Sequence, residues 1–245
     1  MSLIARNLRF IVVFLLFLLA ARPGLAAAGE FHYVTTATVD LTLLLAPPPA
    51  PDSPAERADL DTVIAASKSR SAAEAEGALA DGTISVLRFA DVLGEGFSVD
   101  RLPFALPLFA QVASDTHGIV ASAKVGFDRL RPSVVDNRVA LLRKDVEAGG
   151  AQHHRSGSYP SGHATFAYVS AVLLAGMVPE KASEIYGRAA DYAHNRLIAG
   201  THYPTDIDAG RIAGTVIANV LLHDPVFLDA YAKARVEVRH ALALE

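Results

Sequence analysis

Three separated segments of the 245-residue sequence combine histidines, basic residues and one carboxylate at spacings that suit chemistry on an anion. The first is KVGFDRLRP, in which Lys124 and Arg131 stand seven residues apart. Seven residues make about two turns of helix, so both cations can face one ligand, although Pro132 disfavours helical geometry at Arg131 and predicts a loop there. Taken alone, such a pair is more often a pair of solvated surface charges.

The second segment, GSYPSGHATFAYVSAVLLAG, places Pro160, Ser161, Gly162 and His163 directly before a long apolar run. Ser161 is a natural helix cap, and Gly162 lets a ligand approach the backbone because no side chain intervenes. The first turn of a helix has N–H groups without partners and a partial positive charge, which suits phosphate. For this segment alone, a capped helix with a chance histidine is an equal alternative.

The third segment, HNRLIAGTHYPTD, contains Arg196, His202 and Asp206. Asp206 follows His202 by four residues, so its carboxylate can accept the Nδ1–H of the imidazole and leave Nε2 free as a nucleophile. The structural alternative is that the two residues form a local helix cap. The three segments together supply what a phosphoryl group requires, namely cations, a helix start and two imidazoles.

These segments resemble the signature of the PAP2 (type 2 phosphatidic acid phosphatase) superfamily, K-x6-RP, PSGH and SR-x5-H-x3-D. Every specified position matches except Asn195, where the family usually has Ser. The sequence is most similar to the secreted bacterial class A non-specific acid phosphatases, through LLLAPPPAPDSPAE, GSYPSGHAT and LIAGTHYPTDIDAGRIAG. The matching residues are Lys124, Arg131, Pro132, Pro160, Ser161, Gly162, His163, Arg196, His202 and Asp206.

The resemblance implies a metal-independent acid phosphatase that hydrolyses phosphate monoesters of broad range through a phosphohistidine, without a cofactor. His202 would attack phosphorus, Asp206 would stabilise the imidazolium, and His163 would protonate the leaving alcohol. His163 would start from an imidazole pKa of about 6.5, which bound phosphate raises, and vanadate would inhibit. The implied phosphate ligands are Lys124, Arg131, Arg196 and Ser161 with Gly162, whose backbone N–H groups would take part, and no metal ligand is expected.

Three other functions use similar features. A vanadium-dependent haloperoxidase would bind vanadate at the same anion site, and a membrane lipid phosphate phosphatase would carry the same motifs on about six spanning helices, for which the hydropathy shows no pattern. A periplasmic phosphate-binding module without chemistry is the third, and the presence of both His163 and His202 speaks against it. The physiological substrate and the oligomeric state are open, although a homo-oligomer fits the family.

The N-terminus has the pattern of a secretory signal peptide. Arg6 and Arg9 precede an apolar run from Phe10 to Ala21, and small residues lead to Ala28. That run is too short for a membrane span, which needs about 20 residues. We therefore expect a signal peptide at residues 1–28, an extended Pro-rich segment at 29–54, a PAP2-type acid phosphatase domain at 55–245 and a periplasmic location.

Composition and periodicity predict an all-α, single-domain helical bundle of the PAP2 and vanadium haloperoxidase type. There is no cysteine, which excludes disulfides and thiolate chemistry, and the net charge of −4 disfavours nucleic acid as the main partner. Residues 32–45 give the one strand signal, and residues 133–159 are expected to form a loop with at most a short helix. Helices are expected at 55–69 and 71–80, with Gly77 and Gly82 as breakers, and at 102–124, 161–176, 179–199, 205–222 and from Pro225 onward.

Overall fold

The computed structural model of the protein describes residues 33–142 and 157–244. These residues belong to the unit His32–Glu245, which is described by itself. The expected signal peptide at 1–28 and residues 143–156 of the expected loop lie outside the described residues.

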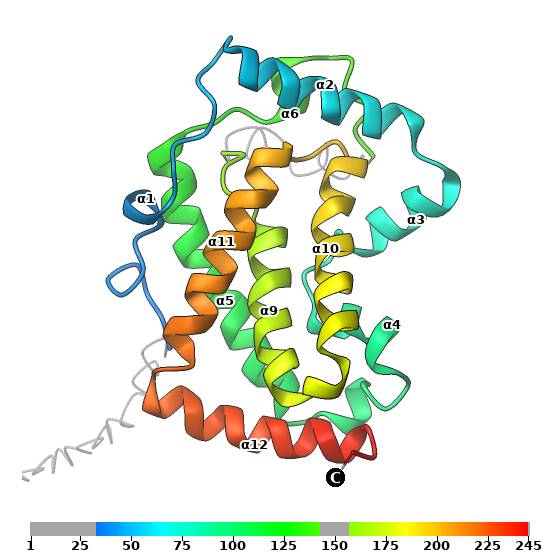
Figure 1. The fold of residues 1–245 in the computed structure, drawn as a ribbon, viewed down its shortest axis with the longest axis vertical. Coiled ribbons are helices and arrows are strands. Elements are labelled where there is room, and N and C mark those ends of the chain that lie inside the picture. Colours follow the sequence, from blue (N-terminus) through cyan, green and yellow to red (C-terminus); the bar gives the residue numbers. More distant parts are fainter. Residues whose placement is uncertain (1–32, 143–156, 245) are drawn as a thin grey trace, which may run out of the picture. The chain divides into compact units, whose positions relative to one another are not determined.

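The described residues form helices joined by loops, with no strand among them (Figure 1). The all-α fold class is thus confirmed. The helices are α1 Leu41–Leu44, α2 Pro54–Ser69, α3 Ala72–Ala80, α4 Ala90–Leu93, α5 Ala105–Phe127, α6 Pro132–Val135, α9 Gly162–Met177, α10 Ala182–Ile198, α11 Pro204–Leu221 and α12 Pro225–Ala241, and the short 3-10 helices are η1 Val86–Phe89, η2 Val99–Arg101 and η3 Pro179–Lys181.

Helix α9 lies at the centre of the bundle. It packs against α11, α10 and α5, and Figure 1 shows it between α10 and α11. Its residues are apolar on nearly every side, and a helix of that kind must be surrounded by other elements. Phe166, Leu173 and Leu174 are almost fully buried. The core therefore encloses the helix whose first turn carries the Pro-Ser-Gly-His motif.

Helices α9 and α11 approach each other closely at two glycines. A Cβ on Gly210 would lie 2.7 Å from the carbonyl oxygen of Ser161, and one on Gly214 would lie 2.5 Å from the carbonyl oxygen of Thr165. Both distances are too short for any side chain to fit. The start of α9 consequently lies directly on the first half of α11, the helix that carries Asp206.

The strand expected at residues 32–45 is wrong. Residues 33–40 form turns, and α1 follows, with the Asp40 carboxylate accepting the N–H of Thr42 at 2.9 Å. The alternating apolar residues Val39 and Leu41 are buried against the helices instead of in a sheet. A lone β-branched segment cannot form a strand because the described chain offers no second strand to pair with it.

Gly77 does not end the helix expected at 71–80. It lies inside α3, which begins with a capping box formed by Ser71 and Glu74 and continues to Ala80. The other expected helices are confirmed with small shifts of their ends. For example, α5 starts after Pro103 and extends past Lys124 to Phe127.

Within the described ranges, no individual helix combines the length and the apolar character needed to cross a bilayer. Helices α11 and α12 meet that criterion only as a pair, across a bend of 98°.

Candidate active site

One cavity of about 770 Å³ brings together residues of all three sequence motifs. That volume is within the range typical of ligand pockets. Lys124 comes from α5, Arg131 precedes α6, Gly162 and His163 form the first turn of α9, and His202 lies between α10 and α11. The remaining lining is mostly apolar and consists of Ile84, Ala113, Thr116, His117, Val120, Ala121, Val125, Asp128, Gly157 and Phe166.

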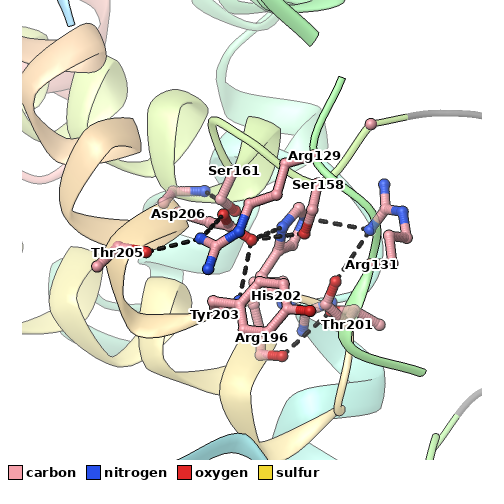
Figure 2. A network of polar contacts seen from close by, with 12 residues as sticks. Arg129, Arg131, Ser158, Ser161, Arg196, Thr201, His202, Tyr203, Thr205 and Asp206 are labelled. Atoms are coloured by element: carbon pink, nitrogen blue, oxygen red, sulfur yellow. Dashed lines mark hydrogen bonds and ion pairs between the residues drawn. The ribbon is translucent and has the colours of Figure 1, made fainter. Parts of the chain in front are cut away.

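The imidazole of His202 is oriented by Asp206 (Figure 2). Its Nδ1 lies 3.2 Å from Oδ2 of Asp206, and its Nε2 lies 3.4 Å from Nη1 of Arg131. A guanidinium only donates, so Nε2 is the acceptor and Nδ1 carries the proton. Burial lowers the pKa of His202 well below 6.5, which makes the ring neutral. This is the protonation state and the tautomer that a nucleophilic Nε2 requires.

Asp206 is fully buried yet ionised. Burial alone would raise its pKa, but the hydrogen bond from His202, the charge of Arg129 and the hydroxyl of Ser158 lower it to about 2. Oδ1 accepts from Nη1 of Arg129 at 2.7 Å, and Oδ2 accepts from the Ser158 hydroxyl at 2.5 Å and the Tyr203 N–H at 2.9 Å. The carboxylate is thereby fixed in the orientation that holds His202.

Sequence analysis missed Arg129, which supports the far side of this carboxylate. Its Nη2 lies 2.8 Å from Oδ2 of Asp59, and its guanidinium lies 3.8 Å from the centre of the Tyr203 ring. The side chain is only 3% exposed. In the sequence, Arg129 is visible only as an arginine two residues before Arg131. Its spacing does not distinguish it from an ordinary arginine on the surface.

The ammonium of Lys124 lies against the segment that precedes α9. It donates hydrogen bonds to the carbonyl oxygens of Gly157 and, at 3.3 Å, Ser158. A Cβ on Gly157 would lie 2.7 Å from the Lys124 carbonyl oxygen, so only glycine permits this approach. Burial, assisted by the charge of Arg131, lowers the pKa of Lys124 to about 7.

Ser161 caps α9 and connects it to α11. Its N–H donates to the carbonyl oxygen of Asp206 at 2.9 Å, and its hydroxyl accepts the N–H of Ala164 at 3.4 Å. The expectation that the Ser161 N–H binds phosphate is therefore wrong, because that donor is already used. The N–H groups of Gly162 and His163 have no acceptor within the helix and are the backbone donors at its start.

His163 lines the cavity, and one nitrogen of its ring contacts a backbone carbonyl. Its Nε2 lies 3.1 Å from the carbonyl oxygen of Gly82. Burial and the positive charges of Arg196, Arg131 and Lys124 lower the pKa of His163 to about 3, and the hydrogen bond to Gly82 opposes this only in part. The expected pKa of about 6.5 is thus wrong for the protein without an anion, in which His163 is neutral.

Arg196 is 2% exposed and is not among the residues that line the cavity. Its Nη2 donates to the carbonyl oxygen of Ala78 at 2.5 Å, and of the three cations it acts most strongly on His163. The neighbouring Asn195 points elsewhere, since its amide donates to Oδ2 of Asp81 at 2.7 Å. Asn195 therefore replaces the usual serine at a structural contact.

A family model described as the PAP2 superfamily matches residues 104–228, a range that contains all three motifs. The chain belongs to the PAP2 superfamily. This PAP2 protein is 28% identical to a non-specific acid phosphatase of Salmonella typhimurium over 94% of its own length and 92% of the relative. It is also 29% identical to a non-specific acid phosphatase of Salmonella typhi over the same shares, and 30% identical to an acid phosphatase of Zymomonas mobilis over 82% of its own length and 76% of the relative.

Proposed function

We propose that this PAP2 protein is a secreted acid phosphatase that hydrolyses phosphate monoesters through a phosphohistidine on His202. The observation that carries the proposal is the contact of Asp206 with Nδ1 of His202, which leaves the neutral Nε2 in a cavity lined by two cations. The relatives named acid phosphatases, which span most of the chain, support the same activity.

In the proposed first step, Nε2 of His202 attacks phosphorus in line, the N–P bond forms and the ester P–O bond breaks. His163 gives a proton to the leaving oxygen. Because the Gly82 carbonyl can only accept, Nε2 of His163 holds a proton there, and Nδ1 is the atom from which the transferred proton comes. The alcohol then leaves, and Asp206 offsets the positive charge of the phosphorylated ring.

In the second step, His163 takes a proton from water, whose oxygen attacks phosphorus as the N–P bond breaks. This releases inorganic phosphate and restores neutral His202.

The proton that His163 donates in the first step arrives with the substrate. A phosphate monoester is partly a monoanion near pH 6 and brings this proton into the site. Its bound negative charge also offsets the cations that lower the pKa of His163.

Phosphoryl oxygens would be held by Lys124, Arg131 and Arg196 with the N–H groups of Gly162 and His163. The Ser161 hydroxyl is a further proposed donor, and the two guanidinium groups suit bidentate contacts to phosphate. These fixed positive charges offset the charge that Mg²⁺ neutralises in other phosphoryl transfer enzymes, so we propose that the reaction needs no metal. Full activity in the presence of EDTA is the expected result.

The decisive experiment follows p-nitrophenyl phosphate hydrolysis at pH 5 to 6 for the wild type, His202→Ala and His223→Ala. His202→Ala is expected to lose activity by at least about 10³-fold. His223 is exposed, and its ring Nδ1 lies 2.7 Å from the Asn219 carbonyl oxygen, so His223→Ala is the matched control with unchanged activity. A phosphoenzyme that survives alkali and is lost in acid should form on the wild type only. Substantial turnover by His202→Ala would reject the mechanism.

Vanadate distinguishes the remaining functions. A phosphatase should be inhibited by micromolar to millimolar vanadate, whereas a haloperoxidase should brominate a dye when vanadate, peroxide and bromide are supplied. A binding module would bind phosphate without any turnover, and a lipid phosphate phosphatase would prefer phosphatidic acid in vesicles to soluble monoesters.

Periplasmic export should yield a mature protein that begins at Gly29.

A further inference from the structure

The segment from Ala78, in the last turn of α3, to Gly82, just after that helix, touches two residues of the proposed machinery through its backbone. The Ala78 carbonyl oxygen accepts from Nη2 of Arg196 at 2.5 Å, and the Gly82 carbonyl oxygen lies 3.1 Å from Nε2 of His163. These residues come from α10 and α9, so one short segment contacts both helices. Its position sets where the two side chains point.

Asp81, between the two carbonyl groups, binds this segment to α10. It is 1% exposed, and its Oδ2 accepts from Nη1 of Arg188 at 3.0 Å and Nδ2 of Asn195 at 2.7 Å. Its Oδ1 accepts from Nη2 of Arg188 and from Nε of Arg88 at 2.8 Å. Burial by itself would raise the pKa of Asp81, but the hydrogen bonds from these three residues lower it, and the carboxylate is ionised.

A second contact holds the other side of Gly82. The hydroxyl of Tyr192, also on α10, donates to the carbonyl oxygen of Thr83 at 2.7 Å. The Tyr192 ring is fully buried and lies 6.4 Å, centre to centre, from the ring of His163. Asp81 and Thr83, on either side of Gly82, are thus both bound to α10. The carbonyl oxygen of Gly82 itself lies against His163.

We propose that Asp81 is a positioning residue for the general acid: by binding the end of α3 to Arg188 and Asn195, it holds the Gly82 carbonyl against Nε2 of His163. This rests on the proposed function, in which His163 protonates the leaving group. The Gly82 contact keeps the proton on Nε2 and directs Nδ1 to the substrate, so a displaced Gly82 leaves the imidazole with the wrong orientation or tautomer.

The expected consequence depends on the leaving group. An alkoxide must be protonated as the P–O bond breaks, whereas p-nitrophenolate is stable enough to leave with little help. Loss of Asp81 should therefore slow alkyl phosphates far more than p-nitrophenyl phosphate. A substitution that only destabilises the fold lowers the amount of active enzyme and reduces both reactions by the same factor.

The test compares kcat/KM for p-nitrophenyl phosphate and ethyl phosphate in the wild type, Asp81→Asn and Asn195→Ala. We expect the ratio of the two values to change by about tenfold or more in Asp81→Asn and in the same direction, by less, in Asn195→Ala. Asn195→Ala removes one hydrogen bond only and keeps the test decisive if Asp81→Asn does not fold. Tyr192→Phe, which frees the Thr83 carbonyl, should move the ratio the same way.

The matched control is Asp115→Asn. Asp115 is 2% exposed and Asp81 1%, but the carboxylate of Asp115 accepts from the backbone of Tyr33 and Val34 and from the side chain of Gln111, residues with no role in the proposed reaction. Its ratio should equal that of the wild type. An unchanged ratio in both Asp81→Asn and Asn195→Ala would overturn the inference while leaving the phosphatase in place, whereas a wild type that hydrolyses neither ester would reject the proposed function itself.

Discussion

Nη1 of Arg129 lies 2.7 Å from Oδ1 of Asp206, while the other oxygen of the same carboxylate lies 3.2 Å from Nδ1 of His202. Arg129 also pairs with Asp59, so two carboxylates and one guanidinium are buried together beside a neutral imidazole. Burial and the charges of Arg131 and Lys124 lower the pKa of His202, whereas the hydrogen bond and charge of Asp206 raise it. Asp206 is therefore the group that would offset the positive charge of the ring in the proposed phosphohistidine, and Arg129 holds it in place.

Replacement of Arg129 by Met should destabilise the protein by about 3–5 kcal/mol, because it leaves two buried carboxylates without their partner. Urea unfolding followed by circular dichroism gives this free energy. Arg138→Met is the control, since the pair of Arg138 with Asp136 is exposed on the arginine side and should contribute little to the free energy of unfolding. Equal losses in the two variants would contradict the role given to Arg129.

Anion binding should weaken above pH 7 as Lys124 loses its proton. The pKa of Lys124 without an anion is about 7, so the ammonium is charged below that pH and neutral above it. Sulfate suits the test because its own charge does not change there. Its inhibition constant for the wild type should rise by up to about tenfold per pH unit above pH 7. In Lys124→Arg, which stays charged, the rise should be smaller, and identical profiles would show that Lys124 does not bind the anion.

Stability should fall as the pH drops from 6.5 toward 3, in part because His163 is neutral in the folded protein. Its pKa is about 3 when folded and about 6.5 when unfolded, so in this window unfolding takes up a proton. The contribution of His163 is about 1.4 kcal/mol per pH unit. Asp206, whose folded pKa is about 2 and whose ordinary value is 3.8, contributes below about pH 5, so measurements from pH 5 to 6.5 isolate the histidines.

His163→Gln should therefore show a flatter dependence of the unfolding free energy on pH than the wild type. His240→Gln, which changes an exposed histidine on α12, should keep the slope of the wild type. The experiment is done without phosphate, since a bound anion would raise the pKa of His163. If His163→Gln and the wild type have the same slope, the imidazole is not held neutral.

The apolar lining of the cavity predicts a preference for longer alkyl leaving groups. The residues that α5 contributes run from Lys124 back to Ala113, about 16 Å along the helix. For n-propyl to n-octyl phosphates, which share the same leaving-group acidity, kcat/KM should increase about two- to fourfold per methylene while the chain stays in the cavity. Ala113→Asp should remove this gain for octyl but not for propyl phosphate, and a flat series in the wild type would contradict the prediction.

The motifs were enough to group Lys124, His163 and His202, which line one cavity, and to predict Arg131 outside a helix. Arg196 of the third motif is not among the lining residues, and the roles of all these residues in phosphate chemistry stay predictions. Sequence analysis failed for Asp81 and Arg129, since their partners are distant in the chain and each residue alone looks like an ordinary surface charge. Arg188, for instance, reaches Asp81 across 107 positions.

The protonation states of the site residues could not be predicted from the sequence either. The pKa of His163 depends on burial and on cations from three different helices and loops, none of which is adjacent to it in the chain. The strand signal at residues 32–45 failed for a related reason, because β-propensity describes a fit to neighbouring strands and none is described.

The contact of Gly210 and Gly214 with the backbone of α9 has a practical consequence for altering this protein. Even one methyl group at either position would push the first two turns of α9 away from α11, the helix that carries Asp206. A library built to change what the enzyme accepts should leave these two sites untouched and should place its diversity on the α5 wall of the cavity, at Ala113, Val120 and Ala121.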